Sequence, residues 1–170
     1  MRLNRDASSF LAVIEANKGI VYKVARSYCR NETSQQDLIQ EILTQLWLAF
    51  PAYDEQFKLT TWMYRIALNV SISFYRKEIS RSKINHTLPD SILYLKAEEY
   101  SGVRNEMVDQ LYQFIKELKE LDRAIMILYL EENNLQEIAD ILGLTQTNVS
   151  TRISRIKIRL KQKFSNHSNL

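Results

Sequence analysis

Apolar residues recur at helical spacing along almost the whole chain, and the pattern is clearest between residues 135 and 164. The first helix predicted there has one apolar stripe, made of Leu135, Ile138, Ala139 and Leu142. Gly143 follows directly and suits a helix C-terminus, because glycine adopts a positive φ without a Cβ clash. The hydroxyl of Thr145 is placed to cap the next helix.

That next helix is longer, and its apolar residues again follow one face. Its stripe consists of Val149, Ile153, Ile156, Leu160 and Phe164. A short helix, a turn with glycine and a longer helix are typical of a DNA-binding helix-turn-helix. The alternative from pattern and charge alone is a basic, solvated C-terminal helix that packs through its stripe.

The N-terminal third of the chain predicts three helices. Two apolar stripes between Asp6 and Asn31 flank Gly19, so we predict two helices with a break at this glycine. A third helix, capped by Ser34, runs to about Phe50 and ends before Pro51.

A fourth helix, from about Thr60 to about Ser82, has an unusual distribution of side chains. Its first half is apolar on much more than one face, whereas its second half is basic. One interpretation is the central helix of a bundle with a solvated end. The other is a surface for single-stranded nucleic acid, since aromatic faces beside basic groups stack unpaired bases.

Residues 84–104 interrupt the helical periodicity and are predicted to be a linker. Beyond it we predict a helix from Asn105 to about Glu120 and another over residues 121–132, capped by Asp122. With only three glycines and two prolines in the chain, an all-α fold is indicated. We therefore expect two small helical domains, residues 1–83 and 105–170, of which the second contains the helix-turn-helix.

The charges are distributed unevenly along the 170 residues. No Asp or Glu follows Asp140. The same segment contains six cations: Arg152, Arg155, Lys157, Arg159, Lys161 and Lys163. A basic second helix after a glycine turn suits a DNA groove lined with phosphates.

Nothing in the sequence predicts an enzyme, a metal site or a cofactor. The two histidines, His86 and His167, have no carboxylate or cysteine at ligand spacing, and there is no glycine-rich phosphate loop. Cys29 is the single cysteine and is expected to be a small buried hydrophobe. We find no signal peptide and no stretch of about 20 apolar residues, so we expect a cytoplasmic protein.

Two blocks of residues, in this order and at this spacing, are together specific to one protein family. The first block comprises Asp37-Leu38-Ile39-Gln40-Glu41, Leu46-Trp47, Thr61-Trp62-Met63-Tyr64-Arg65-Ile66-Ala67-Leu68-Asn69 and Arg76-Lys77. The second comprises Leu118-x-x-Leu121, Glu137-Ile138-Ala139-x-x-Leu142-Gly143, Asn148-Val149-x-x-Arg152-Ile153-x-Arg155 and Leu160. The blocks resemble regions 2 and 4 of the extracytoplasmic-function (ECF) sigma factors, small two-domain factors of bacterial transcription initiation.

The resemblance implies a function and a set of partners. It implies that residues 1–83 bind the β′ clamp of core RNA polymerase and the promoter −10 element, whose non-template strand they hold open. It implies that residues 105–170 bind the −35 element as duplex DNA and contact the polymerase β flap. Control by a separate anti-sigma factor is also implied.

The resemblance assigns roles to particular residues. For core polymerase docking these are Asp37, Gln40 and Glu41. For −10 recognition and melting they are Tyr53, Phe57, Trp62, Tyr64, Asn69, Arg76, Lys77 and Arg81. For −35 recognition they are Thr147, Asn148, Ser150, Thr151, Arg152, Ser154 and Arg155, with Lys157, Arg159 and Lys161 on phosphates. Asn148 can reach an adenine or serve the helix cap, and Trp62 can be core instead of contact.

A stand-alone helix-turn-helix regulator is the alternative function. Such proteins normally bind palindromic duplex DNA as dimers. The sequence offers no dimerisation helix for this purpose, and a duplex-binding regulator leaves the aromatic and basic helix from Trp62 to Lys83 without a role.

Overall fold

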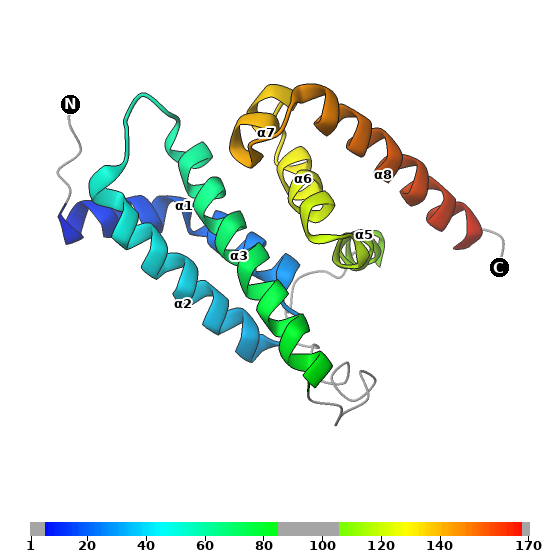
Figure 1. Cartoon of the computed structure of the whole chain (residues 1–170), viewed down its shortest axis with the longest axis horizontal. Helices are drawn as coiled ribbons and strands as arrows, with labels where there is room; N and C mark the ends of the chain where they lie inside the picture. The colour runs from blue at the N-terminus through cyan, green and yellow to red at the C-terminus, as the bar shows by residue number, and fades with distance from the viewer. Residues whose placement is uncertain (1–5, 85–105, 168–170) are drawn as a thin grey trace. The chain divides into compact units, whose positions relative to one another are not determined.

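The computed structural model describes residues 6–84 and 106–167, and Figure 1 shows its helices. Within these ranges all regular secondary structure is helical, and the chain divides into two compact units, Met1–Gly102 and Val103–Leu170. The predicted all-α fold with two small helical domains is therefore confirmed. No helix of the described part has the length and apolarity needed to cross a membrane. The predicted linker, with His86, lies almost entirely outside the described residues.

Unit 1 consists of three long helices and a short connection. The helices are α1 (Ala7–Tyr28), α2 (Glu32–Ala49) and α3 (Leu59–Ile84), with a 3-10 helix, η1 (Phe50–Ala52), after α2. Each long helix contacts the other two. Their shared core includes Val24, Leu38, Ile42, Leu46, Met63 and Leu68, none of which is exposed. Cys29 is buried as expected.

Two sequence predictions for unit 1 were wrong. Helix α1 continues through Gly19 without a break, because buried residues on both sides of the glycine, among them Val13 and Val21, pack into the core of unit 1. Helix α2 is capped by Asn31 and not by Ser34: the Asn31 side chain accepts a hydrogen bond from the Ser34 backbone N–H at 2.8 Å. The Ser34 hydroxyl instead donates to Glu78 of α3 at 2.7 Å.

Five aromatic rings form a contiguous group at one end of unit 1, which we call the aromatic cluster. Its members are Phe10, Trp47, Phe50, Tyr53 and Trp62. Neighbouring ring centroids lie 5.1 to 6.3 Å apart, in edge or tilted arrangements that favour aromatic attraction. The cluster fixes the start of α3 against the ends of α1 and α2.

Unit 2 contains α5 (Glu106–Glu117), α6 (Glu120–Leu130), α7 (Leu135–Leu142) and α8 (Gln146–His167). Helices α6 and α7 contact each other, and both contact α8. One buried group joins α5, α6 and α8 and consists of Phe114, Ile115, Leu118, Met126 and Ile156. The prediction that Asp122 caps α6 was wrong: Lys119 occupies the N-cap position without a side-chain hydrogen bond, and Asp122 lies in the first turn.

Arg123 is a buried cation that joins α6 to the end of α5. Its side chain is 2% exposed, and its Nη2 atom donates to the backbone carbonyls of Lys116 and Leu118, at 2.5 and 3.1 Å. Carbonyls at a helix C-terminus lack partners within the helix, and a cation there also suits the helix dipole.

The connection from α7 to α8 has the geometry that the sequence predicts. At the opposite end of α7, Asn134 and Glu137 form a reciprocal capping box, which was not predicted. Gly143 ends α7 in the left-handed conformation, with φ of 67°. The Thr145 hydroxyl accepts a hydrogen bond from the Asn148 N–H at 3.2 Å, which confirms the predicted cap.

Candidate nucleic-acid interface

Helix α8 has one packed face and one open face. The packed face holds Val149, Ile153 and Ile156, which are at most 5% exposed. Six residues predicted to contact the −35 element are exposed: Thr147, Asn148, Ser150, Thr151, Ser154 and Arg155. The sequence pattern therefore separated core from surface along the first three turns of this helix, where the open face is polar and free of carboxylates. Farther along the helix, the apolar side chain of Ile158 is 58% exposed.

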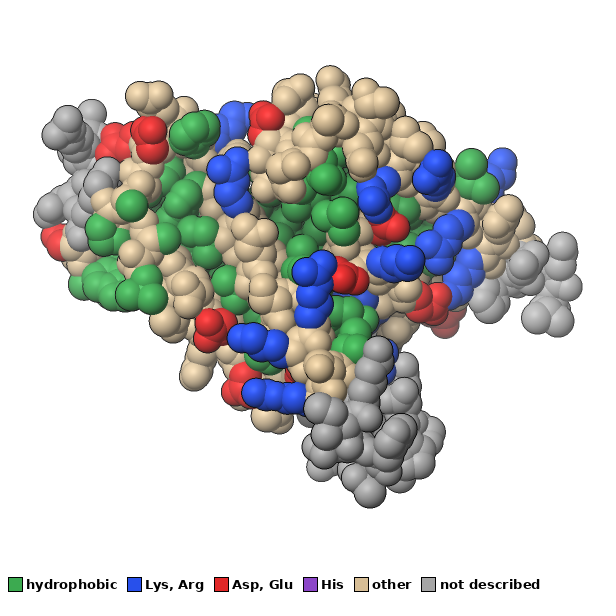
Figure 2. Space-filling view, viewed as in Figure 1, with side chains coloured by type: hydrophobic (Ala, Val, Ile, Leu, Met, Phe, Trp, Pro, Cys, Tyr) green, Lys and Arg blue, Asp and Glu red, His purple; other side chains and the backbone are tan. Residues whose placement is uncertain are grey.

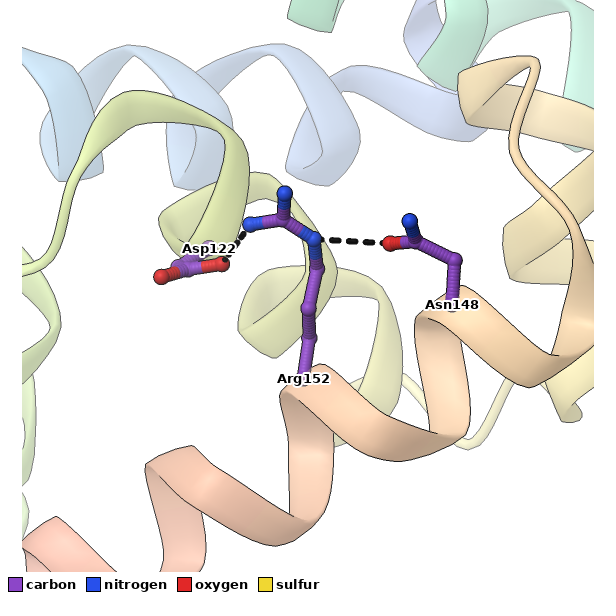
Figure 3. A network of polar contacts seen from close by, with 3 residues as sticks. All are labelled: Asp122, Asn148 and Arg152. Carbon is purple, nitrogen blue, oxygen red and sulfur yellow. Dashed lines mark hydrogen bonds and ion pairs between the residues drawn. The ribbon is translucent and has the colours of Figure 1, made fainter.

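Arg152, the seventh predicted −35 residue, is held by two other side chains of unit 2 (Figure 3). Its Nη1 atom donates to Asp122 at 2.6 Å, in an ion pair between α8 and α6. Its Nε atom donates to the Asn148 amide oxygen at 2.7 Å, one turn earlier on α8. The guanidinium is therefore tied to α6 and to its own helix, and is only partly exposed.

The remaining cations of α8 have different surroundings, although Figure 2 shows Lys and Arg side chains along much of this helix. Lys157 donates to the Tyr129 hydroxyl at 2.6 Å, and its Nζ lies 4.4 Å from the centre of that ring. Lys163 forms an ion pair with Glu117. Arg159 and Lys161 are exposed. Their cationic groups are available to an anionic surface.

The polar face of α2 is also open. The predicted docking residues Asp37, Gln40 and Glu41 are all exposed. Two apolar residues at the C-terminal end of the same helix are also exposed, Trp47 at 43% and Leu48 at 64%, and neither was predicted to be. The signal for Leu48 was available, since it lies outside the apolar stripe of α2. The exposure of Trp47 was hidden, because its spacing fits the stripe.

The residues predicted for the −10 element divide into exposed and buried side chains. Phe57, Asn69, Arg76, Lys77 and Arg81 are exposed. Trp62 is half-buried within the aromatic cluster, whereas Tyr53 and Tyr64 are only 5% and 4% exposed.

Tyr53 has a structural role in the loop before α3. Its hydroxyl donates to the Phe57 carbonyl at 2.6 Å. Burial, with the charges of Glu55 and Asp54 as lesser causes, raises the pKa of this hydroxyl. The hydroxyl therefore stays protonated at neutral pH and can donate. Tyr53 therefore anchors the loop to the core, while the side chain of Phe57 in the same loop stays exposed to solvent.

No group of three or more His, Cys, Asp or Glu side chains within residues 6–84 and 106–167 could hold a metal ion. The open surfaces of both units instead offer amides, hydroxyls, cations and aromatic or aliphatic side chains. These groups suit binding to nucleic acid and protein.

Comparison with known proteins gives matches over both units. Residues 13–81 match the family described as Sigma-70 region 2, and residues 109–160 match Sigma-70, region 4. The two matches together cover more than two thirds of the chain. They contain all of α2 and α7, most of α3 and the larger part of α8.

Relatives of similar length match nearly the whole chain. The ECF RNA polymerase sigma factor SigW of Bacillus subtilis is 26% identical, over 92% of this chain and 89% of the relative. SigM, an ECF RNA polymerase sigma factor of the same organism, is also 26% identical, over 88% and 91%.

Two solved structures share the fold, each at 19% identity. CnrH, in complex with the cytosolic domain of CnrY, has a TM-score of 0.67 over 95% of this chain and 90% of its own. The sigma factor RpoE, in complex with the anti-sigma factor NepR from Bartonella quintana, has a TM-score of 0.68 over 93% and 95%. With both region matches and relatives along most of its length, this chain belongs to the family of ECF RNA polymerase sigma factors.

Proposed function

We propose that this chain directs bacterial core RNA polymerase to promoters, with unit 1 on the polymerase and the −10 element and unit 2 on the −35 element. The observation that carries the proposal is the open face of the first three turns of α8. This face is a polar surface without carboxylates in a helix-turn-helix, in one chain with a region 2 unit. The chain supplies promoter recognition and strand opening, and we propose no catalytic step for it. Its site of action is the cytoplasm, where polymerase and promoter meet.

Unit 2 contacts the −35 element through α8 in this proposal. The exposed side chains of its first three turns face the base edges of the major groove, and Arg155 is the cation among them that can bind guanine or phosphate. Arg159 and Lys161, farther along, bind phosphates. Lys157 contributes less, because Tyr129 already holds its ammonium group.

Unit 1 binds the opened −10 element through the exposed part of the predicted set. Phe57 offers an open ring on which an unpaired base can stack, and Asn69 offers an amide. Arg76, Lys77 and Arg81 lie along the second half of α3 and suit the phosphate backbone. Tyr53 and Tyr64 support this surface from the core, and Trp62 joins the aromatic cluster to it.

Core polymerase binds the open face of α2. Asp37, Gln40 and Glu41 provide a polar rim that fixes orientation through charge. Trp47 and Leu48 add apolar area at the end of the same helix. Unit 2 makes a second contact with the polymerase, at the β flap.

An anti-sigma factor is a further proposed partner. The solved relatives CnrH and RpoE are each bound to another protein, which for RpoE is described as an anti-sigma factor. Affinity capture of the tagged chain from its own cells, with and without added core polymerase, tests this proposal. A regulator should be captured only when polymerase is absent, since both use the open faces of the chain.

Run-off transcription with core RNA polymerase on a pool of promoter fragments tests the main function. We expect a one-to-one complex with core and specific transcription starts on a subset of fragments. Binding to duplex fragments without binding to core would indicate the stand-alone regulator instead. That alternative explains unit 2 but gives the open face of α2 no purpose, and it would be dimeric by size-exclusion mass.

A further inference from the structure

Two consecutive hydrogen bonds connect α6 to the open face of α8, through the side chains of Asp122, Arg152 and Asn148 (Figure 3). Arginine carries only hydrogen-bond donors, so the Asn148 atom that faces the Arg152 Nε must be the amide oxygen. The amide nitrogen, with its two N–H groups, therefore lies on the other side of the amide. Within the described part of the chain this nitrogen has no hydrogen-bond partner, and Asn148 is exposed.

The Arg152 guanidinium is itself fixed. Asp122 is mostly buried, with 17% of its side chain exposed, and its carboxylate holds Nη1 at 2.6 Å. A charge-assisted bond to a carboxylate on a second helix restricts rotation of the guanidinium. The orientation of the Asn148 amide is therefore set by a residue of α6, 26 positions away in the sequence.

The orientation determines which bases Asn148 can recognise. An asparagine that binds adenine in the major groove uses its oxygen and its nitrogen together, because adenine offers one donor and one acceptor there. The oxygen of Asn148 is already engaged by Arg152. The nitrogen remains to donate. Guanine offers it two acceptors, N7 and O6, and thymine offers O4, whereas adenine sets its N6 donor beside its N7 acceptor and cytosine offers only a donor.

We infer that Arg152 is a positioning residue, which turns Asn148 into a pure donor that selects guanine or thymine over adenine and cytosine at one position of the −35 element. The inference rests on the proposed function of α8. It differs from the expectation that both Arg152 and Asn148 contact bases independently. Asn148 is also free for this role because Thr145 serves the helix cap in its place.

The experiment measures how the complex of the full chain with core polymerase binds competing −35 duplexes that carry each of the four base pairs at every position. Asn148→Ala identifies the position that this side chain contacts. There we expect the wild type to prefer guanine or thymine on one strand by about fivefold or more. Asn148→Asp should reverse the ranking toward cytosine and adenine, because a carboxylate offers only acceptors. An acidic residue in the first turn of α8 also favours the helix, so this variant should fold.

Arg152→Met separates positioning from mere stability. Releasing the amide should lower the preference at the Asn148 position to about twofold or less, within the range of a contact that no longer discriminates. Arg155→Met is the matched control, since it removes the same charge from α8. It should weaken binding while leaving the ranking at the Asn148 position unchanged.

Several outcomes would overturn the inference. These are a wild-type preference for adenine at the Asn148 position, an Arg152→Met variant that weakens all duplexes equally with its preference intact, or an Asn148→Ala variant that changes no position. If the wild-type complex showed no sequence preference at any −35 position, the proposed function would be refuted, and this inference with it. If binding is sequence-specific but the wild type prefers adenine at the Asn148 position, the proposed function is supported and only the role of Arg152 is refuted.

Discussion

Arginine occurs in three different environments in unit 2. Arg123 is buried and bonded to backbone carbonyls, Arg152 is paired with Asp122, and Arg155 is exposed. Sequence patterns could place Arg155 on the open face, since the apolar stripe of α8 defines the opposite side. They could not find the pairing of Arg152, because its partner lies 30 positions earlier in the chain. The environment, and not the residue type, decides whether a cation is available to DNA.

Replacing Arg155 with alanine should weaken binding to promoters with an intact −35 element by about 1–3 kcal/mol. The side chain is exposed on the proposed DNA surface, so the loss falls on binding and not on folding. Competition binding of the complex with core polymerase measures it, and titration with core alone is the control. A fall in affinity for core itself would show that this face of α8 contacts the polymerase instead of DNA.

Replacing Arg123 with methionine should destabilise unit 2 by about 2–4 kcal/mol, because two backbone carbonyls lose their buried donor. The two tryptophans, Trp47 and Trp62, both lie in unit 1, so tryptophan fluorescence follows unit 1 while far-UV circular dichroism follows both. The urea midpoint of Arg123→Met should therefore be lower when unfolding is followed by circular dichroism. It should be almost unchanged when unfolding is followed by tryptophan fluorescence. Arg155→Met, an equal change on the surface, should alter stability by no more than about 0.5 kcal/mol. Equal effects of the two variants would contradict the anchoring role of Arg123.

At the scale of elements, periodicity predicted the helices well and their ends less well. The apolar stripes of α7 and α8, with Gly143 between them, predicted the helix-turn-helix correctly. Each of these features depends only on residues close together in the sequence. Caps were harder, since several polar residues near a helix start can serve: Asn31 does so for α2, and Ser34 turns to Glu78 of α3. The burial of Tyr53 and Tyr64 could not be predicted from the sequence either, because aromatic residues suit a core and a base-stacking surface equally.

The two glycines of the described helical regions should respond oppositely to alanine. Gly19 lies inside α1, where a Cβ would meet no atom within 4 Å, so Gly19→Ala should stabilise unit 1 by about 0.5–1 kcal/mol. Gly143 also has space for a Cβ but has a φ of 67°, so Gly143→Ala should cost about 1–2 kcal/mol.

Urea unfolding distinguishes these effects by unit. The gain from Gly19→Ala should appear in tryptophan fluorescence, which follows unit 1, and the loss from Gly143→Ala only in circular dichroism. A destabilised Gly19→Ala variant would mean that α1 needs a flexible point there, as the apolar pattern first indicated.

Across the whole molecule the charges are segregated by element and not spread evenly. The chain has a net charge of only +3, yet no carboxylate follows Asp140, so the positive potential concentrates on α8. Part of that charge is neutralised inside unit 2, where Asp122 and Glu117 pair with Arg152 and Lys163. A count of cations along the sequence therefore overestimates how many can neutralise phosphates.

The salt dependence of −35 binding should reveal which cations of α8 contact DNA. Each neutralised phosphate contributes about 0.9 to the slope of log affinity against log salt concentration. Arg159→Ala and Lys161→Ala should each lower the slope by about 1, because both side chains are exposed. Lys157→Ala should lower it by less than about half of that, since Tyr129 holds this ammonium through its hydroxyl and its ring. If replacing Lys157 lowered the slope by a full unit, DNA would have to displace Tyr129 from the Lys157 ammonium group. Lys157 would then neutralise a phosphate in the complex, and its contact with Tyr129 would exist only in the free protein.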